Sequence, residues 1–337
     1  VGAVIVRDNL IIGEGFHRCY GEAHAEVNAI ASVRDEALLR DATMYVSLEP
    51  CSHYGKTPPC AKLIIQKGIP RVVVACLDPF PEIAGRGVKM LCDAGVEVVT
   101  GVMEQEAVRL NRFFMTLHKK RRPYIILKWA QSEDGFLDRK RNDRSETPAL
   151  LSTPVTRMMV HKLRSEVQAI MVGTNTAVLD NPSLTVRYWT GRSPLRITID
   201  NDLRIPDNAR LFDGNHPVLV YRKQNGKDGQ NGDSFPGKNY VIIDDSADMA
   251  EKIADDLYKR NIGSLLVEGG AQLHRSFLEK GLWDELIVET APVRLGGGVP
   301  AVDFRRYPGV RLSEAKTVPF FSSCSGNSSL IEVYTHN

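Results

Sequence analysis

Four residues near the start of the chain have the types and spacing of a zinc site that carries out hydrolysis. His24 and Glu26 stand in the segment HAEVNAI, and Cys51 and Cys60 stand in the segment LEPCSHYGKTPPC. One imidazole and two thiolates can supply three zinc ligands, which leaves the fourth position of a catalytic site for water. The metal lowers the pKa of that water toward about 7 and so generates hydroxide at neutral pH. The pattern therefore predicts a zinc-dependent hydrolytic site.

Glu26 distinguishes a catalytic zinc site from a structural one. A structural site needs a fourth protein ligand, which His53 could supply. That arrangement leaves Glu26 without a role, whereas zinc nucleobase deaminases use a non-ligand glutamate as general acid and base. Deaminases of the broad superfamily have two residues between the cysteines, and here eight intervene. We favour a deaminase in which Glu26 moves protons between water, the ring nitrogen and the leaving ammonia.

Two helix starts are expected to position these residues. An apolar-periodic stretch opens at HAE, which predicts that His24 and Glu26 lie on the first turn of a helix. Pro50 and Cys51 follow the strand-like stretch TMYVSLE, and proline is common at a first helical position, so a second helix is predicted to begin there. Helix N-termini favour thiolates, because the helix dipole stabilises negative charge.

The composition is that of a globular protein with about two domains. The 337 residues are 43% hydrophobic and 25% charged, and the net charge of +2 provides no overall field for non-specific nucleic-acid binding. No apolar run reaches the roughly 18 residues of a membrane-spanning helix. The cysteines lack the dense pattern of a secreted disulfide scaffold, so we expect a reducing, cytoplasmic compartment. The chain opens at Val1 with a strand-like stretch and no initiator methionine, so we expect it to begin inside the protein.

Alternating strands and helices predict two α/β domains. In the first, strand-like stretches alternate with helical ones and predict a mostly parallel sheet, at residues 1–6, 43–49, 71–78 and 96–101. The charged run HKKRR at residues 118–122, followed by Pro123, predicts a linker. We therefore expect domains over residues 1–120 and 121–337. Residues 223–239 are rich in glycine and asparagine, which predicts an exposed, mobile loop.

Two segments of the second domain could bind a nucleotide cofactor. No GxGxxG motif follows its first strand, but LLVEGGAQL reads as a strand, a Glu268-Gly269-Gly270 turn and a helix. Backbone N–H groups at such a helix start can cradle a pyrophosphate. A tight strand-to-helix turn without a ligand would have the same pattern. The segment VGTNTAVLDNPSLTVR places polar groups after a buried strand, where open α/β sheets bind ligands.

Together these segments resemble the bifunctional riboflavin-biosynthesis family that joins a pyrimidine deaminase to a pyrimidine reductase. The resemblance runs nearly end to end and also includes LDPFPEIAGRGVKML. It implies a cytidine-deaminase-like zinc domain followed by a dihydrofolate-reductase-like α/β domain, with one Zn²⁺ and NADPH as cofactors. The first domain would hydrolytically deaminate 2,5-diamino-6-ribosylamino-4(3H)-pyrimidinone 5′-phosphate. The second would reduce the ribosyl chain of 5-amino-6-(5-phosphoribosylamino)uracil to ribityl.

The resemblance also implies roles for individual residues. The zinc ligands would be His24, Cys51 and Cys60, with Glu26 as proton shuttle. The deaminase substrate would lie against His53, Lys56 and Asp78. The reductase substrate would lie against Leu184, Glu268 and two arginines that clamp its phosphate, Arg164 and Arg187. NADPH would contact Ala130, Thr176, Asp180, Asn201, Gly270, Ala271, Gln272 and Leu273. Asp180 is also our candidate for assisting proton transfer.

Three features depart from the family pattern. Family members normally begin with a helix and an asparagine-containing turn just before the strand that opens this chain, and that asparagine contributes to the deaminase pocket. The family's DPNP is DPFP here, so Phe80 replaces a polar contact. Pro148 and Leu150 correspond to a family serine and tryptophan, so the stacking of that tryptophan on the cofactor is lost.

The residues leave two other functions to consider. The chain could be a single-function deaminase with a non-catalytic dimerisation domain at its carboxyl end, and NADPH binding would discriminate. It could instead be a zinc-stabilised nucleic-acid-binding protein that uses HKKRR and the run DRKRNDR at residues 138–144. The balanced charge and the lack of interleaved aromatic residues argue against that reading. We expect small phosphorylated pyrimidines as substrates, neither nucleic acid nor membrane as a partner, and a homodimer.

Overall fold

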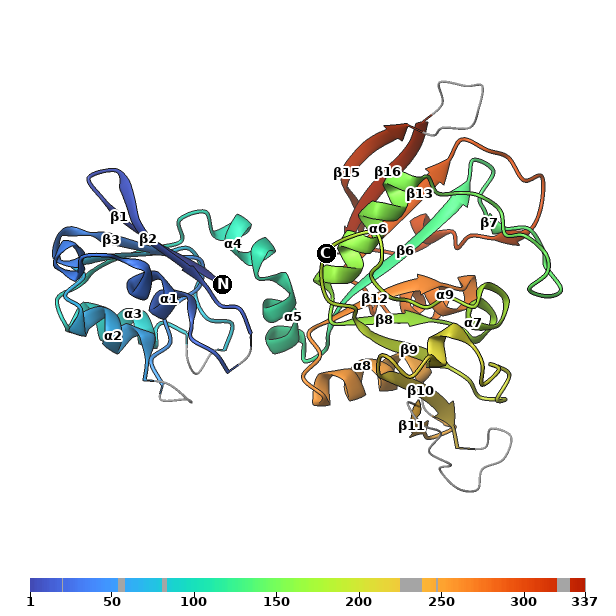
Figure 1. The fold of residues 1–337 in the computed structure, drawn as a ribbon, viewed down its shortest axis with the longest axis horizontal. Helices are drawn as coiled ribbons and strands as arrows, with labels where there is room; N and C mark the ends of the chain where they lie inside the picture. Colours follow the sequence, from blue (N-terminus) through green and yellow to red (C-terminus); the bar gives the residue numbers. More distant parts are fainter. Residues whose placement is uncertain are drawn as a thin grey trace. The chain divides into compact units, whose positions relative to one another are not determined.

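The computed structural model describes residues 1–19, 21–53, 58–80, 84–224, 238–246, 248–319 and 328–336. Contacts between residues divide the chain into two compact units, Val1–Lys120 (unit 1) and Arg121–Asn337 (unit 2) (Figure 1). Most of the loop expected over residues 223–239 lies outside the described residues. No helix in the described ranges has both the length and the apolar character to cross a membrane.

Unit 1 is built on a five-stranded sheet. Its elements in chain order are β1 (Gly2–Arg7), β2 (Leu10–Phe16), α1 (Ala25–Ser32), η1 (Glu36–Asp41), β3 (Thr43–Val46), α2 (Cys60–Gln66), β4 (Arg71–Val74), α3 (Arg86–Asp93), β5 (Glu97–Thr100), α4 (Glu104–Leu110) and α5 (Arg112–Lys120). The strand order is β2-β1-β3-β4-β5. β1 is antiparallel to both of its neighbours, whereas β3, β4 and β5 are parallel.

The mostly parallel sheet expected for unit 1 is therefore wrong for its first part. Asp8 and Asn9 join β1 to β2 with φ angles of 50° and 62°. A two-residue turn with two positive φ angles matches the twist of an antiparallel hairpin, and Asp and Asn tolerate that conformation. This local turn signal imposes antiparallel pairing on an otherwise α/β unit.

One face of the unit 1 sheet carries the core. Alternate strand residues point to that face and pack against α1, α2 and α3, namely Ala3, Ile5, Met44, Val46, Val72 and Val74. β2 touches the backbone of α1 directly, because a Cβ added at Gly15 would lie 2.3 Å from the Ala29 nitrogen. This close contact fixes α1 and the residues at its start.

The expected linker is partly helical. His118, Lys119 and Lys120 form the last turn of α5, where basic side chains complement the negative end of the helix dipole. The helix ends before Arg121, whose φ of 53° is left-handed. Only residues 121–123 separate α5 from the first strand of unit 2.

Unit 2 is built on a nine-stranded mixed sheet. Its elements are β6 (Tyr124–Ser132), β7 (Phe136–Asp138), α6 (Pro154–Glu166), β8 (Ala169–Val172), α7 (Thr174–Asp180), β9 (Leu195–Ile199), η2 (Arg210–Phe212), β10 (Val218–Lys223), β11 (Lys238–Ile243), α8 (Met249–Lys259), β12 (Ser264–Gly269), α9 (Ala271–Glu279), β13 (Glu285–Ala291), β14 (Val299–Pro300), η3 (Phe304–Arg306), β15 (Val310–Pro319) and β16 (Ser328–His336). The order is β11-β10-β9-β8-β12-β6-β13-β16-β15, and β7 pairs with β14 separately. From β11 to β13 in this order, each strand is parallel to the next. β16 pairs antiparallel with β13, and β15 pairs antiparallel with β16.

The two faces of this sheet differ in chemistry. One face packs its apolar side chains against α8 and α9 and forms the core, with Leu127, Trp129, Val267 and Val288 among its members. The neighbouring positions Lys128, Glu268 and Glu289 lie on the opposite face, because successive strand residues alternate. The hairpin of β15 and β16 was not predicted, since nearly every side chain of β15 is exposed and its sequence lacks the apolar alternation of a half-buried strand.

Candidate active sites

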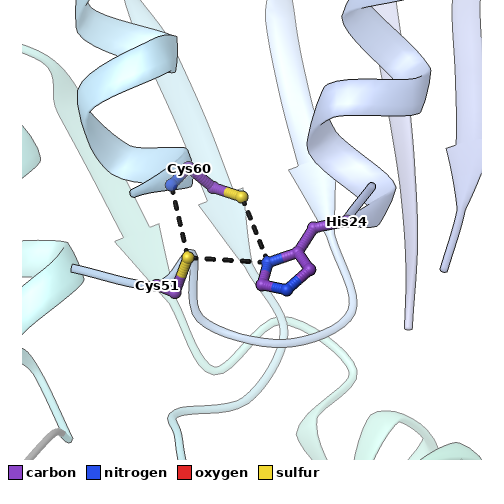
Figure 2. Close-up of side chains that lie close together, drawn as sticks. All are labelled: His24, Cys51 and Cys60. Atoms are coloured by element: carbon purple, nitrogen blue, oxygen red, sulfur yellow. Dashed lines mark hydrogen bonds between the residues drawn. The ribbon is translucent and has the colours of Figure 1, made fainter. Parts of the chain in front are cut away.

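Three candidate zinc ligands meet at the starts of two helices in unit 1. His24 is the N-cap residue of α1, Cys60 is the first residue of α2, and Cys51 lies in the coil after β3. His24 Nδ1 lies 3.5 Å from Cys51 Sγ and 3.4 Å from Cys60 Sγ, and Figure 2 shows the ring nitrogen facing both sulfur atoms. Among the described residues, this is the one group of at least three His, Cys, Asp or Glu side chains whose ligand atoms all lie within 4.8 Å of one another.

These separations fit a tetrahedral zinc ion. Zinc binds sulfur at about 2.3 Å and nitrogen at about 2.05 Å, so a tetrahedral angle places a sulfur and a nitrogen ligand about 3.6 Å apart. The two sulfur–nitrogen distances of 3.5 and 3.4 Å agree with that value. His53 is exposed and is not a member of this group. The arrangement therefore fits a three-ligand catalytic site better than a closed structural one.

The helix expected at Pro50 and Cys51 does not begin there. α2 begins at Cys60, directly after Pro58 and Pro59. A proline disfavours the helical conformation in the residue before it but is tolerated at a helix start, so the proline pair sets the position of the first turn. The Cys60 backbone N–H donates to Cys51 Sγ at 3.3 Å. The start of α2 thus stabilises the Cys51 thiolate from across the loop.

The three candidate ligands differ in how readily each loses its proton. Hydrogen bonds from Cys60 and from His24 lower the pKa of Cys51 to about 4. The same hydrogen bond to Cys51, together with burial, raises the pKa of Cys60. The hydrogen bond to Cys51 also raises the pKa of His24. Zinc ligands must be deprotonated, so the raised pKa values of Cys60 and His24 make metal binding here compete with protons.

Glu26 lies beside this group on the first turn of α1. Its side chain is 3% exposed, and burial raises the pKa of its carboxyl. Glu26 lies on the first turn of α1 as predicted, whereas His24, expected on that turn as well, precedes it as the N-cap residue. A buried carboxyl that binds a proton more readily than usual is suited to general acid and base chemistry.

Two of the three residues expected to line the deaminase substrate site are described. His53 is exposed, and Lys56 lies outside the described residues. Asp78 is half-buried, and burial raises the pKa of its carboxyl. Its Oδ1 accepts a hydrogen bond from the Phe80 backbone N–H at 2.9 Å. The Phe80 ring, where the family has asparagine, packs with its centroid 4.5 Å from that of the His118 ring.

A buried glutamate that the sequence analysis missed connects the zinc loop to the loop of Asp78. Glu49 is 5% exposed. Its carboxylate accepts four backbone N–H groups at 2.8 to 3.2 Å, from Asp78, Gly85, Gly87 and Val88. Three of these donors stand at the start of α3, where backbone N–H groups have no partner within the helix. The only sequence signal was a charged residue at the end of the strand-like stretch TMYVSLE.

Unit 2 contains the expected strand, glycine turn and helix. β12 ends at Gly269, and Gly270 has a φ of 87° and caps the start of α9. Glycine is favoured at that φ, and the first backbone N–H groups of α9 are available to an anion. Thr176 packs against the turn, since a Cβ added at Gly269 would lie 3.0 Å from its side chain. Thr176 thus meets the other expected cofactor contacts at the start of α9, which are Gly270, Ala271, Gln272 and Leu273.

Two expected substrate contacts, Arg164 and Glu268, are paired with each other. Arg164 Nε donates to Glu268 Oε1 at 2.8 Å, and Nη2 donates to Oε2 at 2.5 Å. The two side chains are 11% and 10% exposed, so this is a buried bidentate ion pair. Arg164 Nη1 also donates to the Thr185 carbonyl at 3.1 Å. Arg164 is therefore not an exposed helix charge, and its guanidinium is largely engaged before any phosphate binds.

The segment with Leu184 and Arg187 is held by a histidine that the sequence analysis missed. The Arg187 backbone N–H donates to His161 Nδ1 at 2.9 Å. Burial, together with the positive charges of Arg164 and Arg187, lowers the pKa of His161 to about 4, so the ring is neutral and can accept. Leu184 is 1% exposed and has a φ of 55°. The Arg187 guanidinium donates to the side chains of Ser183 and Thr185 within its own loop.

The remaining expected residues lie at the carboxyl edge of the unit 2 sheet or close to it. Asp180 is the last residue of α7 and forms an ion pair with Arg141. Asn201 follows β9 and accepts the Lys223 backbone N–H at 2.9 Å. Ala130 is partly buried on β6. The departing positions Pro148 and Leu150 are exposed, so neither fills a pocket.

A buried lysine and glutamate beside Glu268 were also missed. Lys128 Nζ lies 3.8 Å from Glu289 Oε2, and the side chains are 12% and 2% exposed. Lys128 stands two residues before Ala130 on the same face of β6. A charged residue inside each of the apolar stretches YIILKWA and DELIVETAP was the available signal.

Comparisons with known proteins match both units. Residues 1–76 match the cytidine and deoxycytidylate deaminase zinc-binding region, and residues 123–320 match the RibD C-terminal domain. The first match contains His24, Glu26, Cys51 and Cys60, and the second contains the glycine turn of β12 and α9. The expected order of a deaminase-like zinc domain and a reductase-like α/β domain is confirmed.

Relatives extend over nearly the whole chain. The riboflavin biosynthesis protein RibD of Aquifex aeolicus is 39% identical over 305 residues, which covers 90% of this chain and 83% of the relative. RibD of Bacillus amyloliquefaciens is 40% identical over 88% of this chain and 79% of its own length. A solved Thermotoga maritima diaminohydroxyphosphoribosylaminopyrimidine deaminase/5-amino-6-(5-phosphoribosylamino)uracil reductase superposes with a TM-score of 0.85 at 34% identity, covering 100% of this chain and 91% of that one. This chain therefore belongs to the RibD family of riboflavin-biosynthesis proteins, with a zinc-binding deaminase region followed by the family's reductase domain.

Proposed function

We propose that this chain catalyses two consecutive reactions of riboflavin biosynthesis. Unit 1 deaminates 2,5-diamino-6-ribosylamino-4(3H)-pyrimidinone 5′-phosphate with water, and unit 2 reduces 5-amino-6-(5-phosphoribosylamino)uracil with NADPH to the ribityl product. The observation that carries the proposal is the His-Cys-Cys group in unit 1, at zinc-binding distances and beside a buried glutamate, in a chain that also has the RibD reductase domain.

In unit 1 we assign the zinc ion to His24, Cys51 and Cys60. Zinc, when bound, supplies a Lewis acid that makes water a better nucleophile. Glu26 takes a proton from the attacking water and delivers protons to the pyrimidine nitrogen and to the departing ammonia. Its burial supports this role, because burial raises the pKa of the Glu26 carboxyl and so makes it a better proton acceptor than an exposed glutamate.

The deaminase substrate lies against His53, Lys56 and Asp78 in this proposal. A lysine suits a phosphate monoester as a mobile point charge. Asp78 is supported by its connection to the zinc loop through Glu49, which keeps its loop beside the ligand group.

In unit 2 the NADPH pyrophosphate lies at the start of α9, on residues 270–273, with Thr176 beside it. Ala130, Asn201 and Asp180 contact the rest of the cofactor. Asp180 stays our candidate for assisting proton transfer, although Arg141 competes for its carboxylate. Lys128 is a second candidate, because it is a nearly buried ammonium beside Glu268 on the sheet face that carries Ala130.

The reductase substrate lies against Glu268 and Leu184, with its phosphate on Arg187. Arg187 is the better supported of the two arginines, because the Arg164 guanidinium is already paired with Glu268. Arg164 acts in this proposal by orienting the Glu268 carboxylate toward the substrate.

Two alternatives are less well supported. A single-function deaminase leaves unexplained why the RibD C-terminal domain matches residues 123–320 and retains the glycine turn. In the nucleic-acid reading, the basic side chains of residues 138–144 would be available to phosphates. Arg139, Lys140 and Arg144 are exposed, but Arg141 is paired with Asp138 and Asp180, and Arg144 donates to the Val178 carbonyl at 2.5 Å.

The compartment and the assembly state complete the proposal. All five cysteines in the described part of the chain are free, which supports a reducing, cytoplasmic compartment. The long exposed strand β15 at the edge of the unit 2 sheet supports a homodimer, because an edge strand offers unpaired backbone groups to a second chain. We propose small-molecule substrates only, with neither nucleic acid nor membrane as a partner.

One sample tests both reactions. The zinc-loaded chain is given the diaminopyrimidine phosphate and NADPH, and ammonia release and NADPH oxidation are followed separately. The parent chain should give both signals. Glu26→Gln should keep its zinc, release no ammonia, and still oxidise NADPH when deaminated substrate is supplied. Arg187→Ala should raise the reductase KM while ammonia release continues; an equal loss of both reactions would contradict two separate sites.

A further inference from the structure

A buried carboxylate in unit 2 has no role in the fold or in the reactions described so far. Glu289 is 1% exposed on β13. Its Oε2 accepts a hydrogen bond from Ser152 Oγ at 2.8 Å and lies 3.8 Å from Lys128 Nζ. Its Oε1 is buried, and no described residue donates a hydrogen bond to it. Such a group costs stability, so packing alone does not account for a glutamate at this position.

Glu289 joins three elements that border the candidate reductase site. It stands opposite Ala130 in the pairing of β13 with β6, and Lys128 stands on the same face two residues earlier. Ser152 directly precedes Thr153, the N-cap residue of α6. α6 carries Arg164, which pairs with Glu268 on β12, the strand on the other side of β6 from β13. A single carboxylate therefore contacts both the buried ammonium and the start of the helix that orients Glu268.

Glu289, rather than Glu268, is the carboxylate available to Lys128. Both Glu268 oxygens accept hydrogen bonds from Arg164, at 2.8 and 2.5 Å. The four buried side chains form two ion pairs of opposite charge, Arg164 with Glu268 and Lys128 with Glu289. Without the Glu289 charge, the Lys128 ammonium would be drawn toward Glu268 and would compete with Arg164 for it.

We propose that Glu289 is a positioning residue of the reductase, which holds the Lys128 ammonium in place beside Glu268. The proposal rests on the reductase assignment of unit 2. In this role Glu289 acts through Lys128 and not on substrate directly, since it is 1% exposed and its free oxygen is buried, although it shares a sheet face with Ala130. It acts by fixing Lys128, and the hydrogen bond from Ser152 helps to hold the Glu289 carboxylate itself.

The test compares Glu289→Gln with Glu289→Asp and with the control Ser152→Ala. Glutamine keeps the shape and the acceptor for Ser152 but removes the charge, so the kcat of reduction should fall at least about tenfold, a loss of about 1.4 kcal/mol of barrier lowering. The KM for NADPH and the rate of ammonia release should not change. Aspartate keeps the charge and should be more active than glutamine. Ser152→Ala keeps the ion pair and should lose less than about threefold, or 0.6 kcal/mol.

The urea midpoint of unfolding separates positioning from a structural role. Glu289→Gln leaves the Lys128 ammonium without its carboxylate, so the urea midpoint should fall as well as kcat. Leu257→Ala, in the core on the other face of the sheet, should lower the midpoint too but keep its kcat. An unchanged kcat in Glu289→Gln would overturn the proposal, as would an equal loss of kcat in Leu257→Ala. A higher activity of the glutamine variant than of the aspartate variant would overturn it too.

The chemical reactivity of Lys128 can be measured without any reductase turnover, so it tests the positioning by Glu289 separately from the reductase assignment of unit 2. Acetic anhydride labelling of Lys128, read by peptide mass spectrometry, should be slow in the parent and faster in Glu289→Gln because the ammonium is released. If the parent shows no reductase activity and the labelling still rises, the positioning holds and the reductase assignment fails. Equal labelling in both proteins would overturn the positioning itself.

Discussion

His161 should make unit 2 sensitive to acid, and this effect can be isolated with one substitution. Its Nδ1 accepts the Arg187 backbone N–H at 2.9 Å, which requires an unprotonated nitrogen. The His161 side chain is buried, and three charged groups act on it, Arg164, Arg187 and Glu268. Burial is the largest cause and the two arginines the next, and they lower the pKa of His161 to about 4. In His161→Asn the amide oxygen is separated from Cα by the same number of bonds as His161 Nδ1. It can therefore still accept the Arg187 N–H, but it does not titrate.

The size of the effect follows from the two pKa values. Histidine in the unfolded chain titrates near 6.5, and in unit 2 near 4, so the unfolded state binds more protons between these values. The free energy of unfolding should therefore fall as pH drops, by about 2 kcal/mol between pH 7 and pH 5 and by about 3 kcal/mol at pH 4. Below about pH 3 both states are protonated and this contribution changes no further. In His161→Asn the corresponding fall should be absent.

Tryptophan fluorescence during urea unfolding measures this for unit 2 alone. All three tryptophans lie in unit 2, at Trp129, Trp189 and Trp283. Buried His274 also has a pKa lowered to about 4, chiefly by burial, but it is present in both proteins and subtracts out of the comparison. The loss of the ring contact between His161 and Tyr188 shifts stability equally at every pH. Equal pH slopes for the parent and His161→Asn would refute the reasoning.

Three further predictions concern the charged and metal-binding groups. Cys60→Ser should lose zinc, measured by mass spectrometry, and should lower the unfolding midpoint of unit 1, because bound metal contributes folding free energy; unchanged zinc content would refute the ligand assignment. Glu49→Ala should destabilise unit 1 by on the order of 3 kcal/mol in far-UV circular dichroism, since four backbone N–H groups lose their acceptor, and a loss under 1 kcal/mol would contradict the cap. Arg164→Met should destabilise unit 2 by about 3 to 5 kcal/mol, because it leaves the buried Glu268 carboxylate unpaired. The double variant Arg164→Met with Glu268→Leu should lose much less, because neither charge remains. Losses that simply add would argue against a mutually dependent pair.

The zinc ligands could be predicted because their chemistry depends on residue type. An imidazole, two thiols and a nearby glutamate have few other uses in that combination, and α1 begins within one residue of where the apolar periodicity indicates. The position of Cys51 was mispredicted, since two local signals competed. Pro50 suggested a helix start, but Pro58 and Pro59 determined it, and the hydrogen bond from the Cys60 N–H to Cys51 crosses the intervening loop.

The antiparallel start of the unit 1 sheet has a local signal in the sequence. Asp8 and Asn9 stand between two apolar stretches, and residues that tolerate positive φ at such a place favour a tight antiparallel hairpin. Basic residues at the end of an amphipathic stretch equally favour a helix C-terminus over a linker, as in α5.

The sequence by itself determined the two α/β units, the zinc group, the glycine turn and the family, because these depend on residue type and on short spacings. Only the tertiary structure decided which charged side chains are buried and which partner each of them pairs with. Lys128, Arg164, Glu268 and Glu289 come from four separated elements, and they meet because β12, β6 and β13 are neighbours in the sheet and α6 lies against the same face. Strand order across a sheet is a long-range property, and the cost of burying a charge depends on the partner that this order supplies.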